Sequence, residues 1–132
     1  MNDEQRAFLE ARKWAVLATG RLDGSPQAST VGYVLDDEGR LLLSVKAFTA
    51  KWKNALRQPR VAIVVNDGRK QCVIYGRAEG IDAYPERAEL SGRVFERLSG
   101  NPAPGGEAFQ KLLDDQQRTV LRVTPEKITL ND

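Results

Sequence analysis

Basic side chains gather in one stretch of the chain, residues 44–59, which reads SVKAFTAKWKNALRQP. Lys51 and Lys53 fall in the first turn of a predicted helix, where the helix dipole disfavours each cation by about 0.3–1 kcal/mol. Lys46 lies just before this helix, and Arg57 repeats the charge of Lys53 four residues later, a further small cost. A bound phosphate would offset these costs by accepting hydrogen bonds from the lysines and the free N–H groups of the helix start. The sequence therefore predicts an anion site, and a solvated basic face is the alternative that stays open.

Polar side chains on two predicted strands form a second set of candidates. Alternation along residues 28–35 places Thr30 on one face of its strand, with Ser29 and Tyr33 on the other. Gln71 begins a later strand and could donate a hydrogen bond to a ring carbonyl. Because Thr and Tyr are common in strands, and strand ends are commonly exposed, a structural role is the alternative for each of them.

The residue types that the chain lacks exclude several kinds of site. It has no histidine and one cysteine, Cys72, which excludes Ser-His-Asp and Cys-His catalysis, removes the commonest zinc and haem ligands, and leaves no intramolecular disulfide. The acidic runs 36–38 and 114–115 lack the spacing of a calcium loop, so we expect solvated turns or helix ends and no metal site. Cys72 is expected to pack as a small hydrophobic residue. No acid–base pair stands out, so no catalytic residue is predicted.

Length and charge bound the class of protein. The 132 residues are enough for a single domain, 1–132, and the net charge of +2 is too small to indicate a nucleic-acid partner. The longest apolar runs are far too short to cross a bilayer, and the acidic start does not resemble a secretory signal. We therefore expect a cytoplasmic protein with a small-molecule substrate, no membrane partner and no nucleic acid.

The elements that position these residues follow from the hydrophobic pattern. Strands arrive as consecutive hairpins, which predicts a mainly antiparallel sheet that is closed or strongly curved. Expected helices start after Asp3, Thr49 and Pro85, end near Arg12, Gln58 and Gly100, and a fourth covers residues 107–117. Gly76 is a candidate bulge or close backbone approach. The expected strands cover residues 14–20, 28–35, 40–45, 61–65, 71–81, 119–123 and 127–130.

Taken together, several segments carry a resemblance to a known family. They are WAVLATGRLDGSPQASTVGYVL, LLLSV followed by AKWKNALRQPRVAIVV, QCVIYGRAEGI, and RTVLRVTPEKI. Over nearly its whole length the chain resembles the split β-barrel flavin and deazaflavin oxidoreductases related to pyridoxamine phosphate oxidase. This resemblance implies a mainly β fold with short α-helices, an antiparallel split β-barrel of the FMN-binding type. It also implies a homodimer with two equivalent sites at the subunit interface.

The resemblance further implies a cofactor site at the start of the basic helix. Flavin-binding oxidases of the superfamily hold a phosphate there with an Arg-Lys pair, whereas the matching residues here are Ala50 and Lys51. The pattern AKWKN is similar to small actinobacterial members that use the deazaflavin coenzyme F(420), and FMN is the alternative cofactor. By this resemblance Lys51 and Lys53 would bind the phosphate side of the coenzyme, assisted by Asn54. The other implied cofactor-binding residues are Ser44, Val45, Lys46, Thr30 and Gln71.

The function implied by this resemblance is an F(420)-dependent reductase. Reduced coenzyme would transfer hydride to an electron-poor conjugated small molecule, which agrees with the lack of histidine and of an acid–base pair, because the cofactor carries the chemistry. The alternatives are an FMN-binding oxidoreductase of the same fold and a non-catalytic protein that binds the coenzyme or another ligand. Quinones, enones, tetrapyrroles and nitroaromatics all remain open as substrates.

Overall fold

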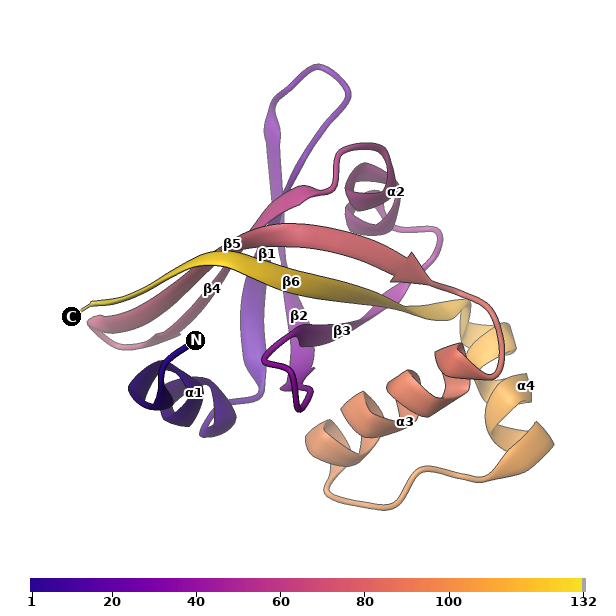
Figure 1. The fold of residues 1–132 in the computed structure, drawn as a ribbon. Coiled ribbons are helices and arrows are strands. Elements are labelled where there is room, and N and C mark those ends of the chain that lie inside the picture. The colour runs from indigo at the N-terminus through magenta and orange to yellow at the C-terminus, as the bar shows by residue number, and fades with distance from the viewer. Residues whose placement is uncertain (132) are drawn as a thin grey trace.

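Six antiparallel strands close into a barrel in the order β1-β2-β3-β6-β5-β4 in the computed structural model, which describes residues 1–131. Four short helices surround it, with α3 and α4 together at one side (Figure 1). The strands are β1 Trp14–Gly20, β2 Pro26–Leu35, β3 Leu41–Lys46, β4 Arg60–Asp67, β5 Lys70–Ile81 and β6 Arg118–Asn131. The helices are α1 Asp3–Glu10, α2 Ala50–Arg57, α3 Glu86–Ser99 and α4 Gly106–Gln116. The mainly β, antiparallel barrel with short helices is therefore confirmed.

Strand β6 is longer than the sequence predicted. The two closing strands expected on either side of Pro125 form one continuous strand that pairs with β3 at its start and with β5 along its length. Pro125 lies opposite Gly76, where the register shifts. A Cβ atom on Gly76 would lie 2.5 Å from the carbonyl oxygen of Thr124, so Gly76 is the close backbone approach that the sequence indicated.

Alternation along the strands creates two apolar clusters. Inward side chains fill the barrel, and α2 contributes Trp52 and Ala55 to one end of this interior. Cys72 is fully buried there, as predicted for a small hydrophobic residue. The second cluster lies outside the barrel, where Leu90 and Val94 of α3 pack on Leu42 and Val120.

Two helix starts differ from the sequence-based expectation. Asn2, not Asp3, is the N-cap of α1, because its side chain accepts from the amide of Gln5 and the Gln5 side chain accepts from the amide of Asn2. Thr49 occupies the N-cap position of α2, but its hydroxyl donates to the carbonyl of Lys46 at 2.7 Å and does not cap the helix. The first turn of α2 therefore keeps N–H groups that no side chain caps within residues 1–131.

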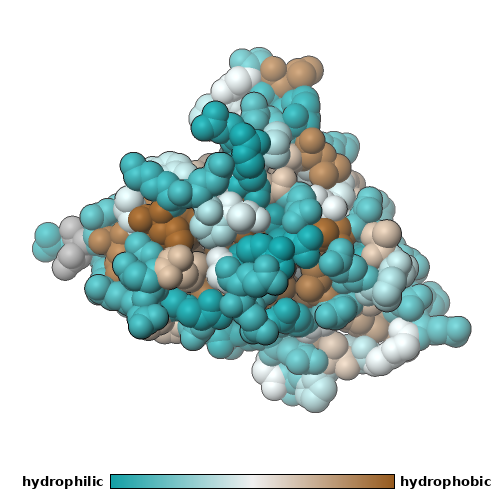
Figure 2. All heavy atoms as spheres, in the orientation of Figure 1, coloured by the Kyte–Doolittle hydropathy of each residue, from teal (hydrophilic) through white to brown (hydrophobic). Residues whose placement is uncertain are grey.

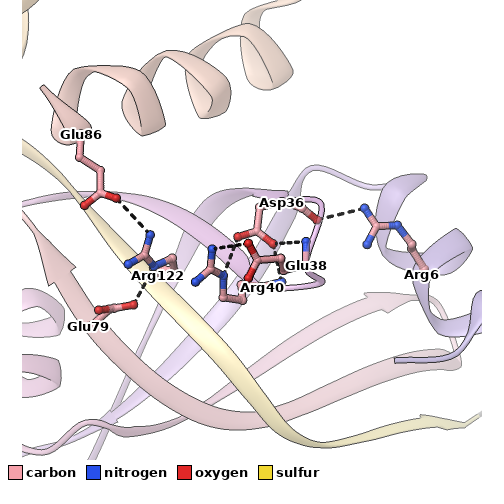
Figure 3. A network of polar contacts seen from close by, with 7 residues as sticks. All are labelled: Arg6, Asp36, Glu38, Arg40, Glu79, Glu86 and Arg122. Atoms are coloured by element: carbon pink, nitrogen blue, oxygen red, sulfur yellow. Dashed lines mark hydrogen bonds and ion pairs between the residues drawn. The ribbon is translucent and has the colours of Figure 1, made fainter.

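In the acidic turn after β2, Asp37 and Glu38 are exposed, as expected of a solvated turn, whereas Asp36 is buried, which corrects the expectation for this residue. Asp36 is 5% exposed and accepts from the amides of Glu38 and Arg40 and from the Arg40 guanidinium at 2.7 Å. The Arg6 guanidinium donates to the main-chain carbonyl of Asp36 (Figure 3). Burial raises the pKa of the Asp36 carboxylate, but the hydrogen bonds from Glu38 and Arg40 outweigh it, and the pKa is lowered. Asp36 therefore holds the β2–β3 turn against α1.

Ion pairs also tie α3 to the barrel surface. Arg122 of β6 lies between Glu79 of β5 and Glu86 of α3, at 2.7 and 3.4 Å (Figure 3). On the face drawn in Figure 2, hydrophilic side chains predominate and apolar atoms appear in separate patches. No helix among residues 1–131 is long and apolar enough to cross a membrane.

Tyr33 gives the barrel interior a measurable pH dependence. Its hydroxyl is buried and donates to the carbonyl of Leu9, and burial raises the pKa of Tyr33 from 10.0 to about 12. Because the unfolded state loses this proton first, we expect the free energy of unfolding to fall by about 2 kcal/mol as the pH rises from 10 to 12. Chemical denaturation of the wild type and of Tyr33→Phe across this range measures the effect. Parallel curves for the two proteins would contradict it.

Candidate functional site

A cluster of cations forms where α2, β3 and β6 meet. Lys51 in the first turn of α2 donates from Nζ to the hydroxyl of Ser29 at 3.3 Å. Arg118 at the start of β6 donates from Nη1 to the hydroxyl of Ser44 at 3.3 Å. Lys46 is the direct neighbour of Arg118 across the β3–β6 ladder. Two strands and one helix thus bring together three cations, and Arg118 is far from the other two in the sequence.

These cations repel one another and are partly withdrawn from water. Burial lowers the pKa of Lys51, and the positive charge of Arg118 lowers it further. Burial also lowers the pKa of Arg118. Within residues 1–131, neither side chain has a carboxylate partner within 4 Å. Together with the uncapped start of α2, this arrangement favours a bound anion, as the sequence predicted for Lys51.

Arg118 is the residue that sequence reasoning missed. It follows Gln117, which has a positive φ of 53°, and it reaches Lys51 only because β6 pairs with β3. No local motif marks it. Arg118 therefore places a second cation near Lys51, whereas Ala50 at the start of α2 carries no charge.

Arg87 of α3 fixes the backbone at Arg118. It is buried, and its Nε donates to the carbonyl of Arg118 at 2.6 Å, while its Nη2 donates to the carbonyl of Leu113 at 3.0 Å. Its Nη1 pairs with Asp114 at 2.7 Å, so this acidic residue at the end of α4 has a structural partner rather than a purely solvated role. Arg87 thus holds the end of α4 and the start of β6 in one position.

Four other predicted residues differ in their surroundings. Thr30 and Ser44 line a cavity together with Arg118. The Val45 side chain points into the barrel interior, so only its backbone could touch a ligand. Lys53 is exposed, and within residues 1–131 it makes no hydrogen bond or ion pair through its side chain.

Asn54 and Gln71 are not free donors at this cluster. Asn54 is buried, donates to the hydroxyl of Thr19 at 3.1 Å and accepts from Arg57 at 3.1 Å, so it holds α2 against β1. Gln71 is exposed at the far end of β5, whose other end meets α2 at Gly80. Nine residues of strand, about 30 Å, separate Gln71 from Gly80. Within this chain Gln71 therefore lies apart from Lys51.

The cavity beside the cations has a volume of about 480 Å³. It lies between α3, α4 and the outer face of β2 and β3, and its walls are mostly apolar. A volume in this range suits a small organic molecule. The site thus combines an apolar chamber with an anion-binding edge.

Comparison with known proteins identifies the family. The family model described as pyridoxamine 5′-phosphate oxidase matches residues 1–132. The chain belongs to this family. The pyridoxamine 5′-phosphate oxidase family and the antiparallel barrel agree with the resemblance drawn from the sequence.

Solved structures share this fold over nearly the whole chain. A conserved hypothetical protein from Mycobacterium tuberculosis is 25% identical, with a TM-score of 0.81, covering 100% of this chain and 85% of the other. An F(420) reductase is 21% identical, with a TM-score of 0.75, and 98% of each chain is covered. The heme storage protein HutZ from Vibrio cholerae is 22% identical, with a TM-score of 0.70, covering 96% of this chain and 91% of the other. The same barrel therefore serves different ligands, and the site must decide the function.

Proposed function

We propose that this protein is an oxidoreductase that uses reduced coenzyme F(420) to reduce an electron-poor conjugated small molecule. The observation that carries the proposal is the pair of Lys51 and Arg118, two partly buried cations beside an apolar cavity. Within the described chain they have no carboxylate partner, so they fit the phosphate of a cofactor whose ring needs apolar walls.

The chain's own residues have separate tasks in this proposal. Lys51 and Arg118 hold the phosphate, and the hydroxyls of Ser29 and Ser44 orient the two cations. Thr30 and Ser44 lie along the ring, and the apolar side chains of α3 and α4 exclude water from the cavity. When bound, the deazaflavin supplies the hydride.

FMN is the second candidate, and one observation favours it. Ala50 replaces the arginine of the Arg-Lys pair, which argues for F(420) by resemblance, but Arg118 restores a second cation beside Lys51. Two cations could also hold the phosphate of FMN. The site chemistry supports a phosphate-bearing flavin-type cofactor in either case.

A parallel titration separates the two cofactors. Purified protein is titrated with F(420) and with FMN, and binding is followed by the fluorescence of each cofactor. We expect F(420) to bind at least about tenfold more tightly, a difference of 1.4 kcal/mol. Tighter binding of FMN would replace the proposal with the alternative, and no binding of either cofactor would contradict both.

We also propose that the protein acts as a homodimer. Three neighbouring strands carry apolar residues on their outer side that pair directly across the strands. These residues form a surface here called the β1–β4–β5 face. Trp14 on this face is 57% exposed and also lines the cavity. Outward positions of a monomeric barrel are usually polar, so this face suits a contact with a second copy. Its residues are Trp14, Val16, Ala18, Ala62, Val64, Val73 and Tyr75.

The position of Gln71 supports the same assembly. The resemblance places Gln71 against the cofactor, but in one protomer it lies at the far end of β5 from α2. Gln71 can therefore contact a cofactor bound near Lys51 only if that cofactor belongs to a second copy of the chain. The proposed dimer therefore gives each site residues from two chains.

A further inference from the structure

The main chain at Arg118 is held by the barrel on one side only. The ladder between β3 and β6 ends with the pair of Lys46 and Arg118. On the other side β5 ends at Ile81, which lies opposite Val120, so within the described chain Arg118 and Thr119 have no partner in β5. The ends of strand ladders open more readily than their middles. The position of this cation therefore depends on contacts from outside the sheet.

Arg87 of α3 supplies such a contact. Its guanidinium donates from Nε to the carbonyl of Arg118 at 2.6 Å and from Nη2 to the carbonyl of Leu113 at 3.0 Å. It thus joins the last turn of α4 to the first residue of β6, across the left-handed residue Gln117, whose carbonyl accepts from the amide of Ala47 at 2.8 Å. A left-handed residue other than glycine persists only where its surroundings hold it.

Arg87 is itself fixed in place. Its Nη1 pairs with Asp114 at 2.7 Å and donates to the hydroxyl of Tyr84 at 3.2 Å. Its hydrogen bonds thus use four of the five N–H groups of a guanidinium. Only 9% of its side chain is exposed, so a displaced guanidinium would leave buried carbonyls unpaired. We therefore expect Arg87 to act on the site through Arg118 and not by touching a ligand.

The main-chain position of Arg118 decides where its charge lies. From the start of β6 its side chain reaches the hydroxyl of Ser44 and lines the cavity. Charge-assisted hydrogen bonds to a phosphate need donor distances of about 2.7–2.9 Å. A small displacement of the main chain moves the guanidinium with it, and misplacement by about 1 Å is enough to lose much of such an interaction.

We propose that Arg87 is a positioning residue of the anion site: it sets the place of the Arg118 guanidinium and thereby the affinity of the site for a phosphate group. This inference rests on the proposed function only in taking Arg118 as a phosphate-binding residue. It holds in the same way for F(420) and for inorganic phosphate.

A double-mutant cycle tests this role, with inorganic phosphate titrated by NMR and F(420) by fluorescence. Arg87→Lys keeps the charge but cannot bond to Arg118, Leu113 and Asp114 at once. We expect it to lower the affinity for both ligands by about tenfold. In Arg118→Gln, where the cation is already absent, adding Arg87→Lys should change the affinity by less than about twofold. Equal losses with and without Arg118 would overturn the proposal.

Arg122→Lys is the matched control. Arg122 also joins β6 to α3, through Glu86, but it lies four residues farther along the strand, about 13 Å from Arg118. Chemical denaturation should show a loss of stability in Arg122→Lys and in Arg87→Lys, whereas only Arg87→Lys should lose affinity. A similar loss of affinity in both would mean that any loosening of α3 disturbs the site, which would contradict a specific role for Arg87.

Asp114 offers two milder variants, which should fold even if Arg87→Lys does not, because its side chain is 60% exposed. Asp114→Ala and Asp114→Asn remove the same negative charge, but only asparagine keeps an oxygen that can accept from Arg87. We expect Asp114→Ala to bind phosphate about threefold more weakly than Asp114→Asn. Equal affinities of the two variants would contradict the proposal.

The two ligands separate this inference from the proposed function. If inorganic phosphate shows the expected dependence on Arg87 and Arg118 while F(420) does not bind the wild type, the proposed function fails and the positioning role stands. If the affinity for F(420) depends on Arg118 and not on Arg87, the positioning role fails and the proposed function stands. A wild type that binds neither ligand would contradict both.

Discussion

Replacing Lys51 and Arg118 together with glutamine is expected to lower the affinity for F(420) by about a hundredfold or more. Each cation would lose a charge-assisted hydrogen bond to the phosphate, and such bonds contribute about 1.5–3 kcal/mol each. The unliganded double variant should be at least as stable as the wild type. The reason is that burial and mutual repulsion lower the pKa of Lys51, so its charged form is disfavoured in the folded state.

Lys53→Gln is the matched control for this experiment. Like Lys51→Gln, it removes one positive charge from α2, but at an exposed residue. We therefore expect the affinity for F(420) to change by less than about threefold. Fluorescence titrations measure affinity, and chemical denaturation without cofactor measures stability. Equal losses of affinity in Lys53→Gln and in the double variant would mean that the general charge of α2 attracts the coenzyme. That result would remove Lys51 and Arg118 as a specific site.

Replacing Val16 and Val64 with aspartate is expected to separate the proposed homodimer into monomers. These two residues face each other across β1 and β4 in the middle of the β1–β4–β5 face. Close approach of two such faces would bury like charges, which costs several kcal/mol. Light scattering at low micromolar concentration should report a monomer. The affinity for F(420) should fall as well, because each site would lose the residues of the second copy.

Leu22→Asp provides the control for the dimer experiment. Leu22 is 84% exposed in the turn between β1 and β2, outside the β1–β4–β5 face, so this added charge should leave both assembly and affinity unchanged. Circular dichroism checks that the double aspartate variant keeps its strands. A folded monomer that still bound F(420) with wild-type affinity would show that one chain forms the complete site.

Much of the fold could be predicted from the sequence because it depends on local patterns. Strand-forming runs such as residues 28–35 and 61–65, arriving as consecutive hairpins with turns between them, indicated an antiparallel closed sheet. Lys51 could be chosen as a candidate site residue because its charge conflicts with the start of its own helix. The buried state of Asp36 could not, because it depends on Arg6, which approaches from α1.

Arg118 could not be chosen as a candidate from the sequence, because its position beside Lys51 depends on closure of the barrel. Arg118 joins Lys51 only through the pairing of β6 with β3, and nothing in the residues next to Arg118 indicates this partner. Asn54 has the opposite history. The resemblance implied a phosphate contact, but the fold uses its side chain to join α2 to Thr19.

A crystal structure of the protein with F(420) tests the central claim most directly. We predict that the phosphate of the coenzyme lies at the start of α2, with its oxygens about 2.7–2.9 Å from Lys51 Nζ and from the guanidinium of Arg118. The ring should then lie along Thr30 and Ser44, which line the cavity. A phosphate held elsewhere, with Lys51 and Arg118 still facing solvent, would contradict the assignment of these two residues as the cofactor site.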